Sequence, residues 1–122
     1  MSHILVIDDD DFFREVLVQM LQKDGHQVTE ARDGVQALAL LQRTHPDLIM
    51  TDILMPHMDG VEFITELSRQ SNNTPVIAMS GGRRAITAAF NLESAKLMGV
   101  KVTLSKPIGH SALNAALREI LG

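Results

Sequence analysis

The 122-residue chain contains no cysteine, tryptophan or tyrosine and only four phenylalanines. Without cysteine it can form no disulfide, no thiolate zinc site and no thiol nucleophile. The scarcity of aromatic rings argues against stacking on nucleic-acid bases or on a flavin. A formal net charge of −4 argues against direct binding to nucleic acid, because such binding needs a basic face.

Long apolar runs are also missing from the chain. No stretch is long enough to cross a membrane, and the first residues lack the basic and apolar regions of a signal peptide. We therefore expect no membrane insertion and a cytoplasmic protein. The length suits one compact domain with a substantial core, so a single domain over residues 1–122 is predicted.

Short apolar runs alternate with segments of helical periodicity along the whole chain. The runs predict strands near residues 4–7, 27–31, 48–50, 76–79 and 100–104, and the periodic segments predict helices near 12–23, 34–44, 61–70, 85–98 and 111–121. This alternation with short links predicts an α/β fold, a doubly wound five-stranded parallel sheet with right-handed crossovers. The helical spacing places Phe13, Val16 and Val35 on core-facing stripes. It leaves Phe12 beside the first stripe, either partly exposed for docking or packed in the core.

The stretch 47–60 reads Asp-Leu-Ile-Met-Thr-Asp-Ile-Leu-Met-Pro-His-Met-Asp-Gly. Its apolar run is typical of a strand covered on both faces, and Asp52 falls where that strand ends. In open parallel sheets, ligands bind at the carboxyl ends of the strands. A carboxylate at that edge is poorly solvated unless a positive group accompanies it.

Four acids, Asp8 to Asp11, follow the first predicted strand. Asp10 or Asp11 suits the cap of the next helix, where a carboxylate also complements the helix dipole. Asp8 and Asp9 precede the cap and should reach the same sheet edge as Asp52. Because clustered carboxylate oxygens suit Mg²⁺ or Ca²⁺, we predict a divalent-cation site at this edge.

Two further strands are predicted to end at the same edge. Ser80 ends the fourth strand, where it suits either a turn or a ligand, and Gly81 lets the backbone come close to a bound group. Lys106 ends the fifth strand, and Pro107 restricts it to an extended backbone and makes their peptide bond a candidate for the cis form. Lys106 is therefore the predicted positive partner of Asp52.

Together these side chains would support phosphoryl transfer. A bound Mg²⁺ would offset the repulsion among the acids and leave Asp52 ionised, so that its oxygen could attack phosphorus. The Lys106 ammonium and the Ser80 hydroxyl would meet phosphoryl oxygens. The product would be an aspartyl phosphate.

Four motifs stand in the order typical of two-component response regulators: Asp8-Asp9, Asp52 in Asp-Ile-Leu-Met-Pro-His-Met-Asp-Gly, Ser80 after Val-Ile-Ala-Met, and Lys106-Pro107. Over its whole length the chain resembles a receiver domain of this family, of the stand-alone, chemotaxis-regulator-like kind. The resemblance implies a flavodoxin-like (βα)₅ fold with strand order 2-1-3-4-5.

The resemblance also implies the roles of the site residues. Asp52 would be the phosphoacceptor, Asp9 and Asp52 direct Mg²⁺ ligands, Asp8 a ligand largely through water, and the Leu54 carbonyl the remaining protein ligand. The phosphodonor would be a phosphohistidine on a sensor histidine kinase or a histidine phosphotransfer protein. Phosphorylation would change docking to a downstream protein target.

Three positions depart from the family pattern. Thr103 stands where a Tyr or Phe usually switches between solvent and core, and Ile108 replaces a common Phe. Ser80 and Lys106 lie 26 positions apart, about four more than is usual, which predicts an enlarged loop or helix between them. The resulting hypothesis is a readout through residues 81–98 instead of an aromatic switch.

Two alternatives compete with a phosphoacceptor. An Mg²⁺-dependent aspartyl-phosphate phosphatase needs a general acid two residues after its nucleophile, where this chain has Leu54. A degenerate receiver that only binds partners is disfavoured by the full set of acid, hydroxyl and lysine positions. We expect a signalling domain that promotes its own phosphorylation and dephosphorylation, and not a conventional enzyme. Because neither Leu54 nor Gly82 can activate water, a long-lived phosphoryl group is predicted.

Overall fold

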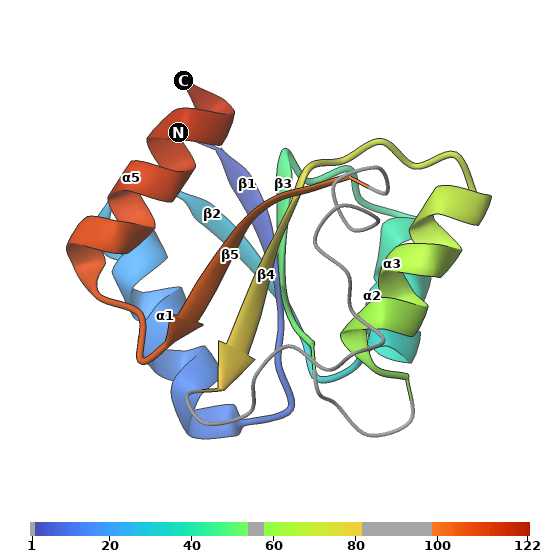
Figure 1. The fold of residues 1–122 in the computed structure, drawn as a ribbon, viewed down its shortest axis with the longest axis horizontal. Coiled ribbons are helices and arrows are strands. Elements are labelled where there is room, and N and C mark those ends of the chain that lie inside the picture. The colour runs from blue at the N-terminus through green and yellow to red at the C-terminus, as the bar shows by residue number, and fades with distance from the viewer. Residues whose placement is uncertain (1, 54–57, 82–98) are drawn as a thin grey trace.

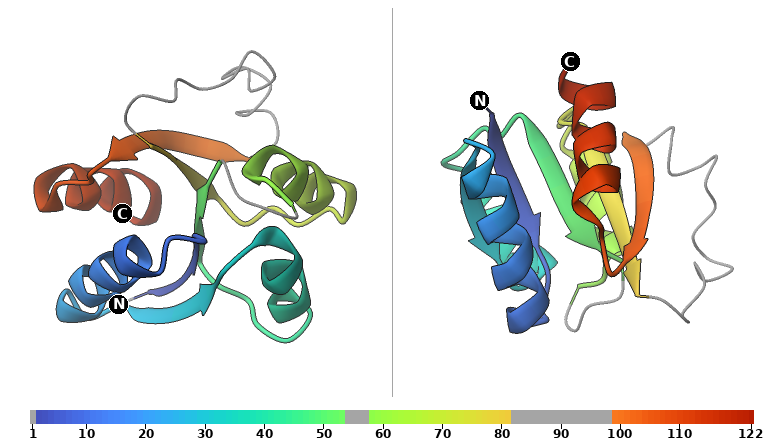
Figure 2. Two further views of the ribbon diagram at one scale, coloured as in Figure 1. Left: turned by 90° about the horizontal axis from the view of Figure 1, so that it is seen from below. Right: turned by 90° about the vertical axis from the view of Figure 1, so that its left-hand side faces the viewer.

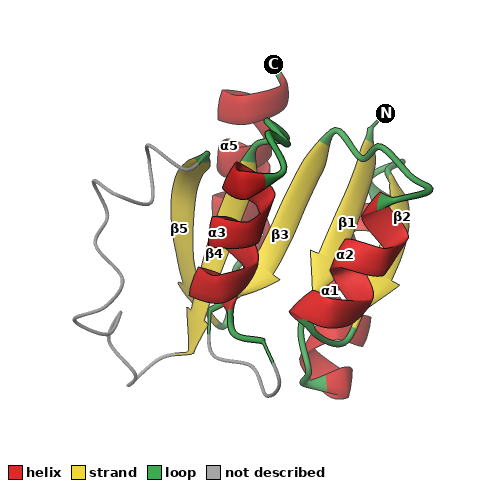
Figure 3. Ribbon diagram, turned by 90° about the vertical axis from the view of Figure 1, so that its right-hand side faces the viewer, coloured by secondary structure: helices red, strands yellow, loops and turns green. Residues whose placement is uncertain are grey.

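The computed structural model describes residues 2–53, 58–81 and 99–122. Five parallel strands form one sheet in the order β2-β1-β3-β4-β5, which confirms the predicted doubly wound, flavodoxin-like topology. The strands are β1 (His3–Ile7), β2 (Gln27–Ala31), β3 (Leu48–Asp52), β4 (Val76–Gly81) and β5 (Val100–Lys106). Their carboxyl ends all point to the same edge of the sheet, the lower edge in Figures 1 and 3.

Helices cover both faces of this sheet. They are α1 (Asp11–Lys23), α2 (Gly34–Leu41), α3 (Gly60–Arg69) and α5 (His110–Leu121). Figure 2 shows α1 and α5 on one face and α2 and α3 on the other. The helix predicted near residues 85–98 lies outside the described residues. None of the described helices is both long and apolar enough to cross a membrane.

The sheet separates two apolar clusters. Along β1, Leu5 and Ile7 belong to the cluster beneath α2 and α3, whereas Ile4 and Val6 belong to the cluster beneath α1 and α5. All four side chains are fully buried, because successive residues of a strand point to opposite faces and both faces are covered. Burial of each such side chain contributes about 1.5–3 kcal/mol to folding. The uninterrupted apolar runs of the sequence have this cause.

Two core predictions are wrong. Val16 is 43% exposed and Val35 is 55% exposed. In α1 the buried residues are Leu17, Val18 and Leu21, so the contact stripe lies on the Val18 side of Leu17 and leaves Val16 outside it. In α2 the buried residues are Gly34, Ala37 and Leu41, and Val35 lies one position away from that stripe. Phe12 is exposed, as one of its two predicted placements required.

The strands β4 and β5 are longer than predicted. Their pairing continues through Ser80 with Ser105 and Gly81 with Lys106, so polar and glycine residues extend the sheet beyond the apolar runs. The Lys106–Pro107 bond is cis. The extension carries Ser80 and Lys106 to the edge where β1 and β3 end.

Candidate functional site

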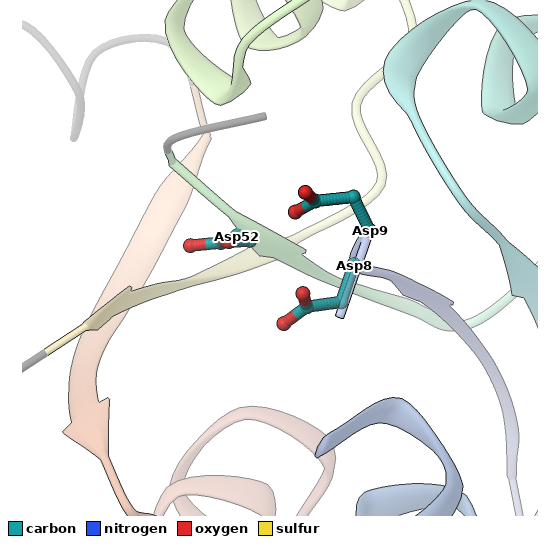
Figure 4. Close-up of side chains that lie close together, drawn as sticks. All are labelled: Asp8, Asp9 and Asp52. Atoms are coloured by element: carbon teal, nitrogen blue, oxygen red, sulfur yellow. The ribbon is translucent and has the colours of Figure 1, made fainter. Parts of the chain in front are cut away.

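Three carboxylates gather at the carboxyl edge of the sheet. Asp52 is the last residue of β3, and Asp8 directly follows β1, whose Ile7 pairs with Thr51 of β3. One carboxylate oxygen from each of Asp8, Asp9 and Asp52 lies within 4.8 Å of the other two. Figure 4 shows the three side chains gathered at this edge. Asp8 is fully buried and Asp52 is 6% exposed, while Asp9 is exposed. The parallel sheet therefore brings together the acids singled out by the sequence.

Lys106 is the positive group beside these acids. Its Nζ lies 2.7 Å from Asp8 Oδ2 and 3.3 Å from Asp52 Oδ2, and it donates a hydrogen bond to the latter. The lysine side chain is only 16% exposed. Three charges thus share a largely buried space, where their interactions are screened less than at the surface.

The backbone that carries Asp8 is held by several hydrogen bonds. Its N–H donates to the carbonyl of Ala31 at 3.1 Å, and its Oδ1 accepts from the N–H of Asp10 at 2.9 Å. Asp10 in turn caps α1 by accepting from the N–H of Phe13 at 3.0 Å, which confirms one of the two predicted caps. The turn from β1 into α1 is therefore built from the acidic run itself.

Arg14 donates hydrogen bonds to the same turn. The sequence pattern did not single it out. Its guanidinium donates to the Asp8 carbonyl at 2.6 Å, to Asp11 Oδ1 at 2.8 Å and to Glu30 Oε1 at 3.0 Å. Burial lowers the pKa of Arg14, but the hydrogen bonds and charges of Asp11 and Glu30 outweigh burial and raise it. Asp11 and Arg14 are three positions apart, a spacing that places both on one face of a helix. This spacing was the sequence signal that could have identified Arg14.

Gly60 brings α3 against the end of β3. Its N–H donates to the Ile53 carbonyl at 2.7 Å, and a Cβ at this position would lie 2.5 Å from the Asp52 carbonyl oxygen and 2.7 Å from Ile53 Cα. No side chain fits there without a shift of backbone. Asp59, just before it, caps α3 in a capping box with Glu62. The sequence predicts a turn at Asp59-Gly60. It does not predict that Gly60 brings α3 against the backbone of Asp52.

Electrostatics disfavour the ionised acids when they stand alone. Burial raises the pKa of Asp8, and the nearby Lys106 ammonium offsets this only in part. Burial is also the main reason that the pKa of Asp52 is raised, with repulsion from Asp8 next and attraction to Lys106 opposing both. For Lys106, burial lowers the pKa, but the two carboxylates outweigh burial and raise it. Lys106 therefore stays protonated, but its single positive charge does not offset the burial and mutual repulsion of the two carboxylates.

The acidic cluster fits a divalent cation. Asp8 Oδ2 is buried and faces the Lys106 ammonium at 2.7 Å as an ion pair, but this one ammonium is shared with Asp52. Two buried carboxylates that share one ammonium are costly, and an oxygen-seeking cation such as Mg²⁺ would offset that cost. One more positive charge would also reduce the repulsion between Asp8 and Asp52.

The remaining predicted site residues are placed unequally. Ser80 is half-buried and follows Met79, the residue paired with Asp52, while Gly81 pairs with Lys106. Both residues lie at the same edge as the acids. Leu54 lies outside the described residues. Thr103 pairs with Ala78 within the sheet and is half-buried.

The comparisons with known proteins agree with this arrangement. A family model described as the response regulator receiver domain matches residues 4–118. The transcriptional regulatory protein CpxR of Klebsiella pneumoniae is 36% identical over 99% of this chain and 50% of its own length. AfsQ1 of Streptomyces coelicolor, also a transcriptional regulatory protein, is 33% identical over 99% of this chain and 52% of its own. The chain spans about half the length of these curated relatives.

Solved structures give the same picture. The receiver domain of the Francisella response regulator 1452 is 28% identical with a TM-score of 0.85, covering 98% of this chain and 96% of that one. The Vibrio cholerae chemotaxis protein CheY4 is 30% identical with a TM-score of 0.84 over 98% of both chains. The receiver domain of sensor histidine kinase PA1611 from Pseudomonas aeruginosa is 28% identical, with a TM-score of 0.84 over 99% of this chain and 98% of its own. That structure has a magnesium ion coordinated in its active-site cleft.

Proposed function

Because the chain belongs to the response regulator receiver domain family, we propose that it accepts a phosphoryl group on Asp52 and signals in the phosphorylated form. One observation supports this most directly. A nearly buried carboxylate at the end of β3 lies 3.3 Å from the Lys106 ammonium and within 4.8 Å of two more acids. This set supplies a nucleophile, a fixed cation and the oxygen ligands for a metal.

We propose Mg²⁺ as the cofactor. Asp9 and Asp52 would bind it directly, Asp8 largely through water, and the Leu54 carbonyl would complete the protein ligands, as the family resemblance implies. When bound, Mg²⁺ would neutralise the acids and stabilise the charge on the transferred group. The grouping of three carboxylates beside a single ammonium supports this assignment.

The chain's own residues would divide the reaction between them. An Asp52 oxygen forms a bond to phosphorus as the phosphorus–nitrogen bond of the donor histidine breaks, and the electron pair returns to the imidazole. The Lys106 ammonium meets one phosphoryl oxygen, the Ser80 hydroxyl donates to another, and Gly81 leaves room for them. Later attack by water releases phosphate and restores Asp52. Leu54 and Gly82 stand two positions after Asp52 and Ser80 in the sequence, where the family resemblance implies side chains that flank the phosphoryl group. Because neither can activate water, this return should be slow.

The partners follow from the chemistry. The donor would be a phosphohistidine on a sensor histidine kinase or a histidine phosphotransfer protein, and the recipient of the signal a downstream protein. Residues 1–122 would form one receiver domain acting in the cytoplasm, as the family implies. The chain would not be an enzyme with a separate substrate, although it promotes its own phosphorylation and dephosphorylation. The phosphatase alternative is not favoured by the family match.

The readout would differ from the usual aromatic switch. Thr103 has no aromatic ring that could move between solvent and core, so we propose that residues 81–98 respond instead. Of these, residues 82–98 lie outside the described residues. Amide exchange with and without the phosphate mimic beryllofluoride tests this. Unchanged protection over 81–98 would count against it.

Mass spectrometry after incubation with acetyl phosphate and Mg²⁺ tests the proposed function. We expect one phosphoryl group on the wild-type chain, none on Asp52→Asn, and none on the wild type when EDTA replaces Mg²⁺. Asp47→Asn is the matched control, because Asp47 precedes the opposite end of the same strand, where its side chain accepts a hydrogen bond from the His3 N–H. Modification that persists in Asp52→Asn would refute the assignment.

A further inference from the structure

Phe13, near the start of α1, lies against Lys106 of β5. The Lys106 Nζ is 4.3 Å from the centre of the Phe13 ring, within the roughly 6 Å over which an ammonium is attracted to an aromatic face. The same nitrogen contacts Asp8 at 2.7 Å and Asp52 at 3.3 Å. The ammonium therefore faces two carboxylates and the negative face of one ring.

The backbone and the ring of Phe13 both have partners besides Lys106. The Phe13 N–H is held by the capping carboxylate of Asp10 at 3.0 Å, and its side chain packs against the apolar cluster beneath α1 and α5. Lys106, by contrast, reaches the site on a flexible stem of four carbons, whose rotamer freedom opposes a single position. A rigid surface beside the ammonium reduces the positions that it can take.

We propose that Phe13 is a positioning residue for phosphoryl transfer, whose ring keeps the Lys106 ammonium beside Asp52 by a cation–π interaction. This inference rests on the function proposed above. During transfer, Lys106 must replace carboxylate contacts with phosphoryl oxygens. A hydrogen bond is lost when its acceptor moves, whereas attraction to a ring face tolerates small shifts of the cation. The ring would therefore hold the ammonium while its other partners change.

Ordinary packing is the competing explanation, because Phe13 also fills space beside the core. The two explanations differ in what they require of the ring. Packing requires its volume and shape, while the cation–π interaction requires the electron density on its face. Fluorine atoms on the ring withdraw that density and change the shape little, so a fluorinated series separates the two explanations.

The experiment uses the whole chain and the rate constant for phosphorylation of Asp52 by acetyl phosphate at saturating Mg²⁺. Phenylalanines with increasing numbers of ring fluorines are incorporated at position 13 alone. The matched control is the same series at Phe12, the adjacent ring, which is 73% exposed. We expect the rate to fall stepwise with each fluorine at Phe13, by about three- to tenfold in total, and to stay constant at Phe12.

Simple substitutions extend the test. Phe13→Tyr keeps an aromatic face and should keep the wild-type rate, whereas Phe13→Leu should be as slow as the most fluorinated ring. In metal-free protein, the ε-methylene protons of Lys106 should show an upfield ring-current shift that Phe13→Leu abolishes. If Phe13→Leu does not fold, the fluorinated series, checked by thermal melting, still decides the question.

Two results would overturn the inference. One is a rate that does not depend on the number of fluorines at Phe13, and the other is an equal fall in the Phe12 series. In both cases the proposed function would stand, since Asp52 would still be phosphorylated. A wild-type chain that takes up no phosphoryl group on Asp52 would instead overturn the proposed function, and this inference with it.

Discussion

Asp52→Asn should make the metal-free protein more stable, although it removes the proposed phosphoacceptor. The substitution keeps the size of the side chain and the oxygen that accepts from Lys106, but it removes a charge that is nearly buried. Because burial raises the pKa of Asp52, the folded state disfavours the charge that the variant lacks.

The magnitude follows from three opposing contributions. Oxygens of Asp8 and Asp52 lie within 4.8 Å of each other, a repulsion of about 3.5 kcal/mol at an effective dielectric constant of about 20. The 3.3 Å contact between Asp52 and Lys106 supplies about 5 kcal/mol of attraction on the same scale. The remaining attraction of about 1.5 kcal/mol is smaller than the several kcal/mol that burial of one ion costs. We therefore expect the variant to gain about 1–3 kcal/mol at pH 7.

The pH dependence has a definite sign. Asp8 and Asp52 both have pKa values raised above their ordinary 3.8. Between 3.8 and the raised values, the folded protein binds more protons than the unfolded chain. The free energy of unfolding therefore increases as pH falls through the raised values toward the ordinary one. Asp52→Asn removes one of the two groups, so this increase should be smaller in the variant.

Urea denaturation in EDTA, followed by far-ultraviolet circular dichroism, measures these differences in a chain without tryptophan. Asp33→Asn is the control. Asp33 caps α2 at a half-buried position, and asparagine caps equally well, so a change below about 0.5 kcal/mol is expected. Mg²⁺ at ten times its Kd should stabilise the wild type by about 1.4 kcal/mol and the variant by much less. A metal-free Asp52→Asn that is less stable than wild type at pH 7 would refute the reasoning.

Three other predictions concern the surroundings of this site. Asp9→Asn should leave metal-free stability within about 0.5 kcal/mol of wild type, because Asp9 is exposed, but should weaken Mg²⁺ binding about tenfold or more by calorimetry; unchanged affinity would remove Asp9 from the ligand set. Gly60→Ala should lower the free energy of unfolding by about 2–4 kcal/mol, since its Cβ would meet the Asp52 carbonyl, whereas Gly109→Ala, with open space around its Cβ, should change it by less than about 1 kcal/mol. Arg14→Met should lower the free energy of unfolding by about 2 kcal/mol, because three hydrogen bonds are lost. An unaltered urea midpoint would show that the turn after β1 does not depend on Arg14.

The sequence predicted those features that depend on strand ends and on local periodicity. Asp8, Asp52 and Lys106 could be placed together because parallel strands end at one edge, whatever their separation along the chain. The cap of α1 could be narrowed to Asp10 or Asp11 because a cap and its helix are neighbours in sequence, and the structure has Asp10 in that role.

Features that depend on how one element docks on another were not predictable. The rotation of α1 that exposes Val16 is set by its contact with the sheet, and the requirement for glycine at position 60 arises from the approach of α3 to β3. The contact between Phe13 and Lys106 joins a helix to a distant strand. Periodicity placed the ring on the core-facing side but carried no information on which side chain it would meet.

The division of the interior by the sheet has a consequence for how the molecule tolerates change. Leu21 and Leu67 belong to clusters on opposite faces, so truncating both should cost the sum of the single truncations to within about 0.5 kcal/mol. Leu21 and Leu117 share one cluster, and their joint truncation should depart from additivity. The two apolar clusters thus contribute to stability independently of each other, with the sheet between them. Substitutions can accumulate in one cluster during evolution while the packing of the other is preserved.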